Sequence, residues 1–132
     1  MDRVIVGIGT DVIEIARVAR LVTDHSLDLP RIFTARERAH CEDGGARRRH
    51  GRYAAMFAGK EAVMKALGTG WQSDMDWCDI DIRSLDDRGG VLLSGGARRV
   101  AIDRGISRVL VAVSSTRLAG LATAVAEGQC DG

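Results

Sequence analysis

The stretch from Tyr53 to Leu67 restricts the possible folds most, because it predicts one long buried helix. Residues with high helix propensity dominate it, chiefly Ala, Met, Leu, Lys and Glu, and Gly59 is the only helix breaker inside it. Gly68 follows at the position where helices commonly end. The chain has 132 residues, and dividing them would leave pieces too small to bury a stable core. We therefore expect a single domain, residues 1–132, built around this helix.

Apolar runs on both sides of this helix predict the strands of a sheet. A β-branched run leads into Gly9-Thr10-Asp11, which places Asp11 near the end of a first strand. Aspartates and glycines over residues 86–90 predict the turn of a hairpin. Strands are expected over residues 4–8 with a continuation over 12–15, and over 77–82, 91–93, 109–113 and 121–125. The expected fold class is α+β, with a small, mainly antiparallel sheet packed against the long central helix.

Shorter helices and loose segments complete the expected fold. The segment from Ala16 to Val22 separates apolar residues from arginines as an amphipathic helix does. Thr34 and Glu37 have the spacing of a capping box, which begins a second short helix, and a third is expected from Ala97 to Arg104. Mobile, solvated segments are expected at Glu42 to Arg49, which holds two glycines and three successive arginines, and at the tail, residues 128–132.

Charge, hydropathy and cysteine content exclude several classes of function. The 19 basic and 18 acidic residues give a net charge of +1, which provides no field to attract nucleic acid. No apolar run approaches the roughly 20 residues that span a bilayer, so no membrane role is expected. The three cysteines lack the paired spacing of metal ligands, and the first residues do not have the pattern of a secretory leader. A reducing, cytoplasmic location is the simplest expectation for Cys41, Cys78 and Cys130.

A few residues in these elements could carry chemistry, and each has a plain structural alternative. Glu61 and Lys65 lie four residues apart on one helix face, where they can form an ordinary surface ion pair. The following turn, Gly68-Thr69-Gly70, can present backbone amides to phosphates beside Lys60 and Lys65, or it can simply end the helix. Asp11 can bind Mg²⁺ at the rim of the sheet or form a turn. Taken singly, these signals leave the function open.

Taken together, two segments resemble the signature segments of holo-acyl-carrier-protein synthases. They are Gly7-Ile8-Gly9-Thr10-Asp11 and Lys60-Glu61-Ala62-Val63-Met64-Lys65-Ala66-Leu67-Gly68-Thr69-Gly70. The resemblance continues in order through residues 31–34, 77–82, 90–97 and 122–127, so it covers essentially the whole chain. It implies a 4'-phosphopantetheinyl transferase-like domain. The implied reaction is Mg²⁺-dependent transfer of 4'-phosphopantetheine from coenzyme A to a serine of an acyl carrier protein, with release of 3',5'-ADP.

The resemblance also implies roles for single residues. Asp11 and Glu61 would be the Mg²⁺ ligands, and Lys65 would hold the pyrophosphate of coenzyme A as the third catalytic residue. The acidic recognition helix of the carrier protein would meet the first helix. The implied contacts are nucleotide binding by Lys60, Lys65, Gly68, Thr69, Gly70 and Ser115, and carrier-protein binding by Arg17, Arg20 and Arg31. Small members of this family complete each site between subunits, so a homotrimer is expected.

Two positions depart from the family pattern. Met56 stands where members carry an arginine, although Arg52 lies one helical turn earlier, and Ser115 stands where a histidine is expected. Serine is shorter and uncharged, so it would hold coenzyme A less firmly. The alternatives to an active enzyme are a non-catalytic module that binds coenzyme A or a carrier protein, and a small structural or regulatory domain of similar architecture. Carrier proteins of fatty acid, polyketide or peptide synthesis all fit the sequence, as does acylated coenzyme A as donor.

Overall fold

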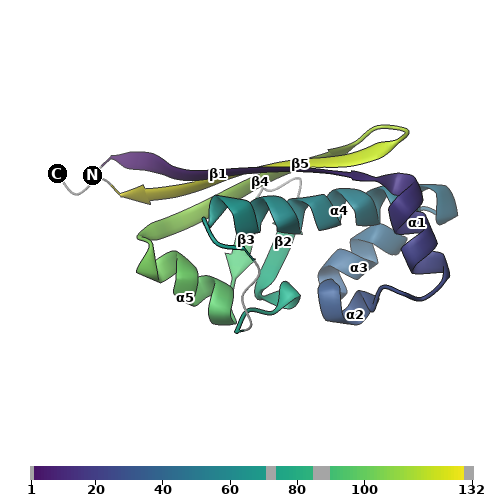
Figure 1. The fold of residues 1–132 in the computed structure, drawn as a ribbon, viewed down its shortest axis with the longest axis horizontal. Helices are drawn as coiled ribbons and strands as arrows, with labels where there is room; N and C mark the ends of the chain where they lie inside the picture. Colours follow the sequence, from purple (N-terminus) through teal and green to yellow (C-terminus); the bar gives the residue numbers. More distant parts are fainter. Residues whose placement is uncertain (1, 71–73, 85–89, 130–132) are drawn as a thin grey trace.

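The computed structural model describes residues 2–70, 74–84 and 90–129, which form a five-stranded sheet with helices on one side (Figure 1). The strand order is β1-β5-β4-β3-β2, and each pair of neighbours is antiparallel. The strands are β1 Arg3–Glu14, β2 Ile80–Ser84, β3 Gly90–Leu93, β4 Ile106–Ser115 and β5 Ala119–Gln129. The helices are α1 Ile15–Thr23, α2 Leu29–Ile32, α3 Ala35–Glu42, α4 Ala46–Ala66 and α5 Gly95–Asp103, with a 3₁₀ turn, η1, at Trp77–Asp79. The predicted α+β class is confirmed.

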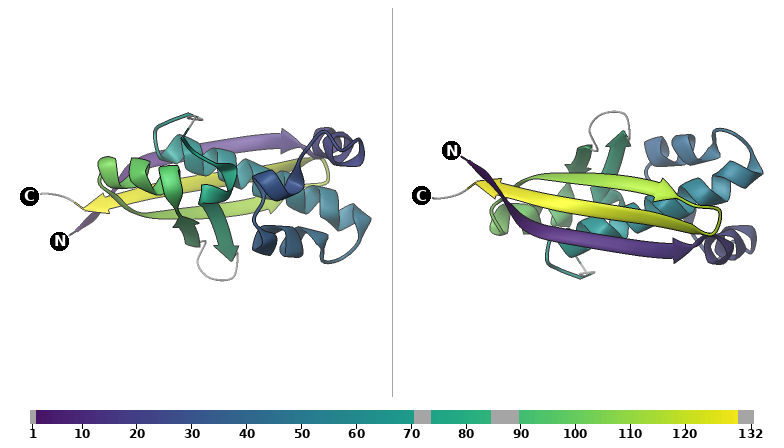
Figure 2. Two further views of the ribbon diagram at one scale, coloured as in Figure 1. Left: turned by 90° about the horizontal axis from the view of Figure 1, so that it is seen from below. Right: turned by 90° about the horizontal axis from the view of Figure 1, so that it is seen from above.

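The three long strands form one layer, and α4 runs along its inner face (Figures 1 and 2). Seen from above, β1, β5 and β4 lie in front and no helix covers them (Figure 2, right). Helices α1 to α3 gather at one end of α4, and α5 lies toward the other end (Figure 1). Within the described ranges, no helix combines the length and the apolar character needed to cross a membrane.

Small residues let α4 lie directly on the backbone of β1 and β5. A Cβ atom on Gly9 would lie 2.0 Å from the carbonyl oxygen of Ala62, and one on Gly120 would lie 2.5 Å from the carbonyl carbon of Ala54. The alternate residues of β5 that face the helix are also small, namely Ala122, Ala124 and Ala126, and all three are buried. This close approach brings β1 within reach of the side chains of α4, which matters for the site below.

We expect Gly120→Ala to lower the free energy of unfolding by about 1–3 kcal/mol, because the added methyl group would collide with the backbone of α4. Gly70→Ala is the matched control, since no described atom lies within 4 Å of its Cβ position. Urea unfolding of both variants measures the difference. Equal midpoints for the two variants would show that the helix can move away from β5 at little cost.

The predicted loop at residues 42–49 is largely wrong. Glu42 ends α3, and α4 already begins at Ala46 rather than at Tyr53, so only residues 43–45 connect the two helices. Gly44 and Gly45 make this sharp connection with φ angles of 113° and 87°. Arginine has high helix propensity, and of the residues that follow Arg48 is exposed while Arg49 lies 2.7 Å from Glu42.

The predicted strands are in the right places, and all of them are too short except the one at 77–82, which begins too early. β1 runs from Arg3 to Glu14 as one strand, because β5 pairs with it along this length apart from a bulge between Ile5 and Gly7. Gly128 and Gln129, expected to be frayed, pair with Val4 and Arg3 in that ladder, and residues 130–132 lie outside the described part. The hairpin of β2 and β3 is confirmed, although residues 86–89 of its predicted turn lie outside the described part too. Trp77–Asp79 forms the turn η1 instead of the start of a strand.

Candidate active site

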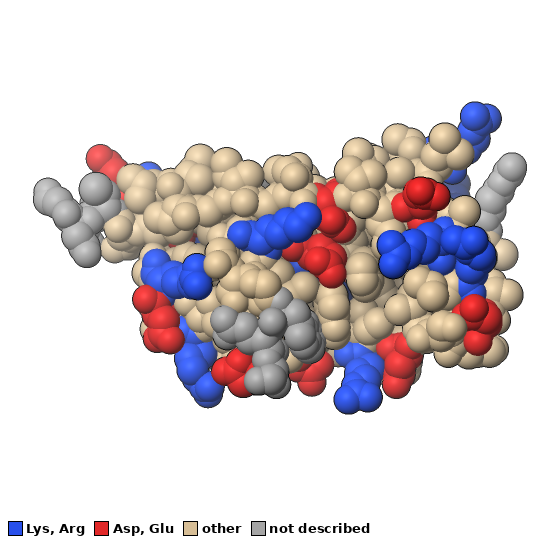
Figure 3. All heavy atoms as spheres, viewed as in Figure 1, with Lys and Arg blue, Asp and Glu red and all other residues tan. Residues whose placement is uncertain are grey.

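Three predicted site residues meet where β1 passes the last turns of α4. Lys65 Nζ lies 3.1 Å from Asp11 Oδ1 and donates a hydrogen bond of 2.8 Å to the carbonyl oxygen of Thr10. Glu61 lies one turn before Lys65 on the same helix, and it is close enough to Asp11 for the two charges to interact. Figure 3, seen from the same side as Figure 1, shows acidic and basic groups side by side near the middle of the molecule. The predicted set of Asp11, Glu61 and Lys65 therefore comes together in space.

The ionisation of Glu61 indicates that this group has excess negative charge. Burial raises the pKa of Glu61, the charge of Asp11 raises it further, and Lys65 lowers it. Two carboxylates and one ammonium group leave a half-buried negative charge that a divalent cation would neutralise. Among the described residues no group of three or more His, Cys, Asp or Glu gathers, so water and substrate would have to complete the shell of such an ion. These features fit Mg²⁺, which keeps several waters and takes one or two carboxylates.

An apolar pocket of about 310 Å³ opens beside the two carboxylates. Asp11 and Glu61 stand at its edge together with Arg17. Its walls are Val12, Ile13, Val18, Leu21, Leu27 and Phe57. The ring of Phe57 stacks on Trp77, with 5.2 Å between the ring centroids, which fixes that wall. Sequence reasoning did not assign Phe57 to the site, although its spacing of four from Glu61 places both on one helix face.

The glycine turn after α4 has the conformation that a helix stop requires. Gly68 adopts a φ of +78°, and its N–H donates to the carbonyl oxygen of Lys65 at 3.0 Å. The Thr69 side chain is mostly buried, and its hydroxyl donates to the carbonyl oxygen of Gly70 at 3.0 Å. Gly68 and Gly70 are exposed, so the turn presents backbone rather than side chains to solvent next to Lys65.

Comparisons with known proteins point to one family. Residues 7–119 match the model of the 4'-phosphopantetheinyl transferase superfamily. Two proteins named holo-[acyl-carrier-protein] synthase, from Chlamydia felis and from Desulforudis audaxviator, are each 42% identical to this chain. The first alignment covers 90% of this chain and the second 94%, and each covers 94% of the relative. The chain belongs to the holo-acyl-carrier-protein synthase family.

Solved structures of this family have the same fold. The holo-ACP-synthase from Plasmodium yoelii aligns with a TM-score of 0.82 at 25% identity, over 98% of this chain and 100% of that chain. The holo-(acyl-carrier-protein) synthase from Bacillus anthracis was solved in complex with CoA (3',5'-ADP). It aligns with a TM-score of 0.72 at 31% identity, and the alignment covers 95% of this chain and 98% of that chain. The chain is thus an enzyme of the phosphopantetheinyl transferase class.

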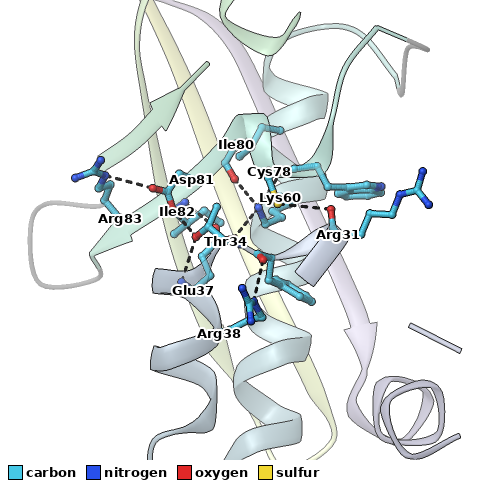
Figure 4. Close-up of polar contacts among 12 residues, drawn as sticks. Arg31, Thr34, Glu37, Arg38, Lys60, Cys78, Ile80, Asp81, Ile82 and Arg83 are labelled. Atoms are coloured by element: carbon cyan, nitrogen blue, oxygen red, sulfur yellow. Dashed lines mark hydrogen bonds and ion pairs between the residues drawn. The ribbon is translucent and has the colours of Figure 1, made fainter. Parts of the chain in front are cut away.

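Lys60, which the family resemblance placed near phosphate, points into the core instead (Figure 4). Its Nζ lies 2.8 Å from Glu37 Oε1, and both side chains are 0% exposed. The same ammonium donates to the carbonyl oxygens of Trp77, at 3.0 Å, and Ile80. The expected contact of Lys60 with a phosphate is therefore wrong for this structure, because the ammonium has no exposed surface.

The partner of Lys60 joins three elements of the fold. Glu37 Oε2 accepts a hydrogen bond of 2.8 Å from the backbone of Ile82, and Glu37 Oε1 accepts one of 2.8 Å from the backbone of Thr34. Thr34 and Glu37 form the predicted capping box, which is confirmed. Glu37 thus connects the start of α3 to β2 and, through Lys60, to α4 (Figure 4). Burial raises the pKa of Glu37 despite the opposing charge of Lys60.

The two departures from the family pattern lie away from Lys65. Met56 is 3% exposed and packs in the core, so it offers no contact to a ligand. Arg52 does not replace the missing arginine, because it donates to the carbonyl oxygens of His40 and Asp43 and closes the connection between α3 and α4. Ser115 is exposed at the end of β4.

The three arginines predicted to contact the carrier protein are all exposed. Arg17 and Arg20 belong to α1, and Arg31 belongs to α2. In the described part of the chain none of the three forms an ion pair, so their charges are available to an acidic partner. Arg17 also stands at the apolar pocket beside Asp11.

Proposed function

We propose that this enzyme transfers 4'-phosphopantetheine from coenzyme A to a serine of an acyl carrier protein, needs Mg²⁺, and releases 3',5'-ADP. The observation that carries the proposal is the meeting of Asp11, Glu61 and Lys65 beside an apolar pocket. Membership of the holo-acyl-carrier-protein synthase family supports it. The free thiols of Cys41 and Cys78 agree with action in a reducing cytoplasm.

In this proposal, different residues of the site bind the metal and the phosphates. The carboxylates of Asp11 and Glu61 hold Mg²⁺, which when bound supplies positive charge to the pyrophosphate oxygens. Lys65 neutralises further charge on the same pyrophosphate, and the exposed backbone of Gly68 and Gly70 leaves room for the nucleotide beside it. Thr69 holds this turn in shape through its hydroxyl.

The acceptor approaches from the side of α1. Arg17, Arg20 and Arg31 attract the acidic helix of the carrier protein, and the neighbouring pocket takes apolar side chains close to the acceptor serine. This docking brings the serine hydroxyl to the edge of the pocket where Asp11 and Glu61 stand. A carboxylate of the site or a water molecule would take the hydroxyl proton. The serine oxygen then forms a bond to the β-phosphorus as the bond to 3',5'-ADP breaks.

The direct test is a mass measurement. An apo acyl carrier protein is incubated with this enzyme, coenzyme A and Mg²⁺, and its intact mass is recorded. We expect an increase by one phosphopantetheine group, lost when the metal is chelated. If the enzyme binds coenzyme A in calorimetry but leaves every carrier protein unmodified, the transfer reaction is wrong and a binding module becomes the better description.

A homotrimer with shared sites is the second part of the proposal. No element of the described residues covers the outer face of β1 and β5, and its exposed residues include Ile8, at 61%, and Val12, at 63%. Ser115 Oγ lies 3.8 Å from the point where a Cβ atom on Gly51 would stand. Gly51 and Lys65 both belong to α4 and are 14 residues apart, which is about 21 Å along the helix axis. Ser115 and Lys65 can therefore hold the same nucleotide only if they come from different subunits.

We expect sedimentation equilibrium at micromolar concentration to give three times the monomer mass, and Ile8→Glu to reduce it to one. The glutamate is harmless in a monomer because Ile8 is already exposed, but it would be buried between subunits. Ile102→Glu on α5, which is 63% exposed in the monomer, is the control. A monomer that keeps full transfer activity would rule out shared sites.

A further inference from the structure

Strands β3 and β4 begin as neighbours in the sheet and then separate. Within the described ranges their ladder has a single residue pair, Gly90 with Leu110. If the antiparallel ladder continued, residues 91–93 would pair with residues 107–109. These two segments instead line a hollow of about 360 Å³, the strand gap. Helix α5, which connects the two strands, forms its third wall (Figure 1).

Two strand edges face the strand gap. On its other edge β3 pairs with β2, and on its other edge β4 pairs with β5. The backbone N–H and C=O groups of a strand point alternately to its two edges. In the described part of the chain, the groups of residues 91–93 and 107–109 that point into the gap have no strand to pair with. Such edges readily accept a strand from another chain.

Large apolar side chains are exposed at the same place. Leu92 of β3 is 49% exposed and Ile102 of α5 is 63% exposed, and both line the strand gap. β3 and α5 lie on the side of the long strands that carries α4, whereas the proposed trimer contact uses the opposite face (Figure 1). That contact therefore does not explain the exposed leucine and isoleucine. Apolar patches of this kind mark interaction sites.

Two arginines and no carboxylate line the strand gap in the described part of the chain. Arg108 is already neutralised, because its guanidinium lies 2.6 Å from Glu127 Oε1. Arg98 is exposed and forms no ion pair with any described residue. One uncompensated positive charge thus stands at the gap, and it favours an acidic group on the molecule that binds there.

The spacing of two side chains on α5 matches that of an extended segment. Arg98 and Ile102 are four residues apart, so they share one face of α5 and lie about 6 Å apart along its axis. In a strand, side chains that point to the same side recur every two residues, or about 6.5 Å. An acidic residue two positions from an apolar one would therefore place a carboxylate at Arg98 and an apolar side chain at Ile102.

We propose that the strand gap binds an extended segment of a partner protein, in which an acidic residue lies two positions from an apolar one. The backbone of the segment pairs with the open edge of β3. Its apolar side chain packs on Leu92 and Ile102, and its carboxylate binds Arg98. This docking site is separate from the transfer reaction, because the three residues of the candidate active site do not line the strand gap.

The test uses the fluorescein-labelled peptide Thr-Val-Thr-Glu-Thr-Val-Thr, whose binding to the full chain is measured by fluorescence anisotropy. We expect saturable binding to the wild type, and binding at least about tenfold weaker when lysine replaces the glutamate. Arg98→Glu should reverse this preference. Arg36→Glu, at an exposed arginine of α3, is the matched control and should leave both affinities unchanged.

Two N-methylated versions of the peptide test the strand pairing. One is methylated on the threonine amides and the other on the valine and glutamate amides. A segment that pairs along one edge donates only alternate N–H groups, so one version should bind and the other should not. Binding of the unmodified peptide should also slow hydrogen exchange in residues 91–93.

Other outcomes contradict the proposal. No saturation up to about 1 mM peptide would show that the strand gap binds no such segment. Equal affinity for the glutamate and lysine peptides would remove the role of Arg98, and equal binding of both methylated versions would rule out strand pairing. If sedimentation shows assemblies larger than the proposed trimer that Ile102→Glu disperses, a second copy of this chain occupies the gap instead.

Discussion

Glu61→Gln should lower the rate of transfer at least about 100-fold and at the same time raise the stability of the folded protein. The rate falls because the amide binds Mg²⁺ poorly, and metal stabilisation of phosphate charge is worth several kcal/mol. Stability rises because burial and the charge of Asp11 both raise the pKa of Glu61 and so disfavour its ionised form. The uncharged amide removes that repulsion.

The sign of the pH dependence follows from the same shift. A carboxyl whose pKa is raised by folding binds its proton more tightly in the folded state than in the unfolded state. Glu61 therefore lowers stability as the pH rises above its ordinary pKa of 4.5, and has no effect well below it. The stability difference between Glu61→Gln and wild type should grow from acidic to neutral pH, as measured by thermal unfolding without metal.

Asp11→Asn should lower the rate of transfer to a similar extent, and it also removes the ion pair with Lys65. Glu14→Gln is the control for both variants, because Glu14 is an exposed carboxylate on the same strand. Turnover is measured over a range of Mg²⁺ concentrations. If one variant keeps near-normal turnover at limiting Mg²⁺, its residue is not a metal ligand.

Lys60→Met should have the largest effect on stability, a loss of about 3–5 kcal/mol in the free energy of unfolding. The substitution leaves the Glu37 carboxylate buried without its partner, and two backbone carbonyls lose their donor. The loss should be smaller at acidic pH, where Glu37 can take up a proton, since burial already raises its pKa. Urea unfolding at two pH values measures both effects.

The double variant Glu37→Gln/Lys60→Met separates charge from packing. It removes both charges and keeps a carbonyl oxygen that can accept the hydrogen bond from Ile82. We expect it to regain a large part of the lost stability. A double variant as unstable as Lys60→Met would show that the hydrogen bonds to Trp77 and Ile80, rather than the unpaired charge, account for the loss.

Local patterns in the sequence were sufficient for the elements that depend on neighbouring residues. The capping box of Thr34 and Glu37, the helix stop at Gly68 and the hairpin of β2 and β3 each depend on contacts within a few residues. The resemblance of two short segments to a family located Asp11, Glu61 and Lys65, and the structure brings these residues together. Those residues lie on one strand and one helix, so their placement follows once the two elements pack.

The burial of Lys60 could not be predicted from local sequence patterns. Lysine is usually exposed, and Lys60 stands next to Glu61 in the motif, so the family resemblance places Lys60 at the phosphates and Glu61 at the metal. Neighbours on a helix point in different directions, and α4 is largely buried on several sides, so its pattern does not show which face meets the core. The deciding partner, Glu37, is 23 positions away. Ser115 shows the same limit, since its distance from Lys65 follows only from the packing of β4 on α4.

The order β1-β5-β4 also has a consequence for synthesis on the ribosome. The middle strand of the long layer, β5, is the last of the three to be made, and β1 has no hydrogen-bonded strand beside it until β5 appears. Such distant pairing slows folding, and the apolar residues of β1 stay open to wrong partners meanwhile. Asp11, on the first strand made, is paired only with β5, so a chain cut short before Ala119 would contain both carboxylates but lack the strand that holds Asp11 beside Glu61.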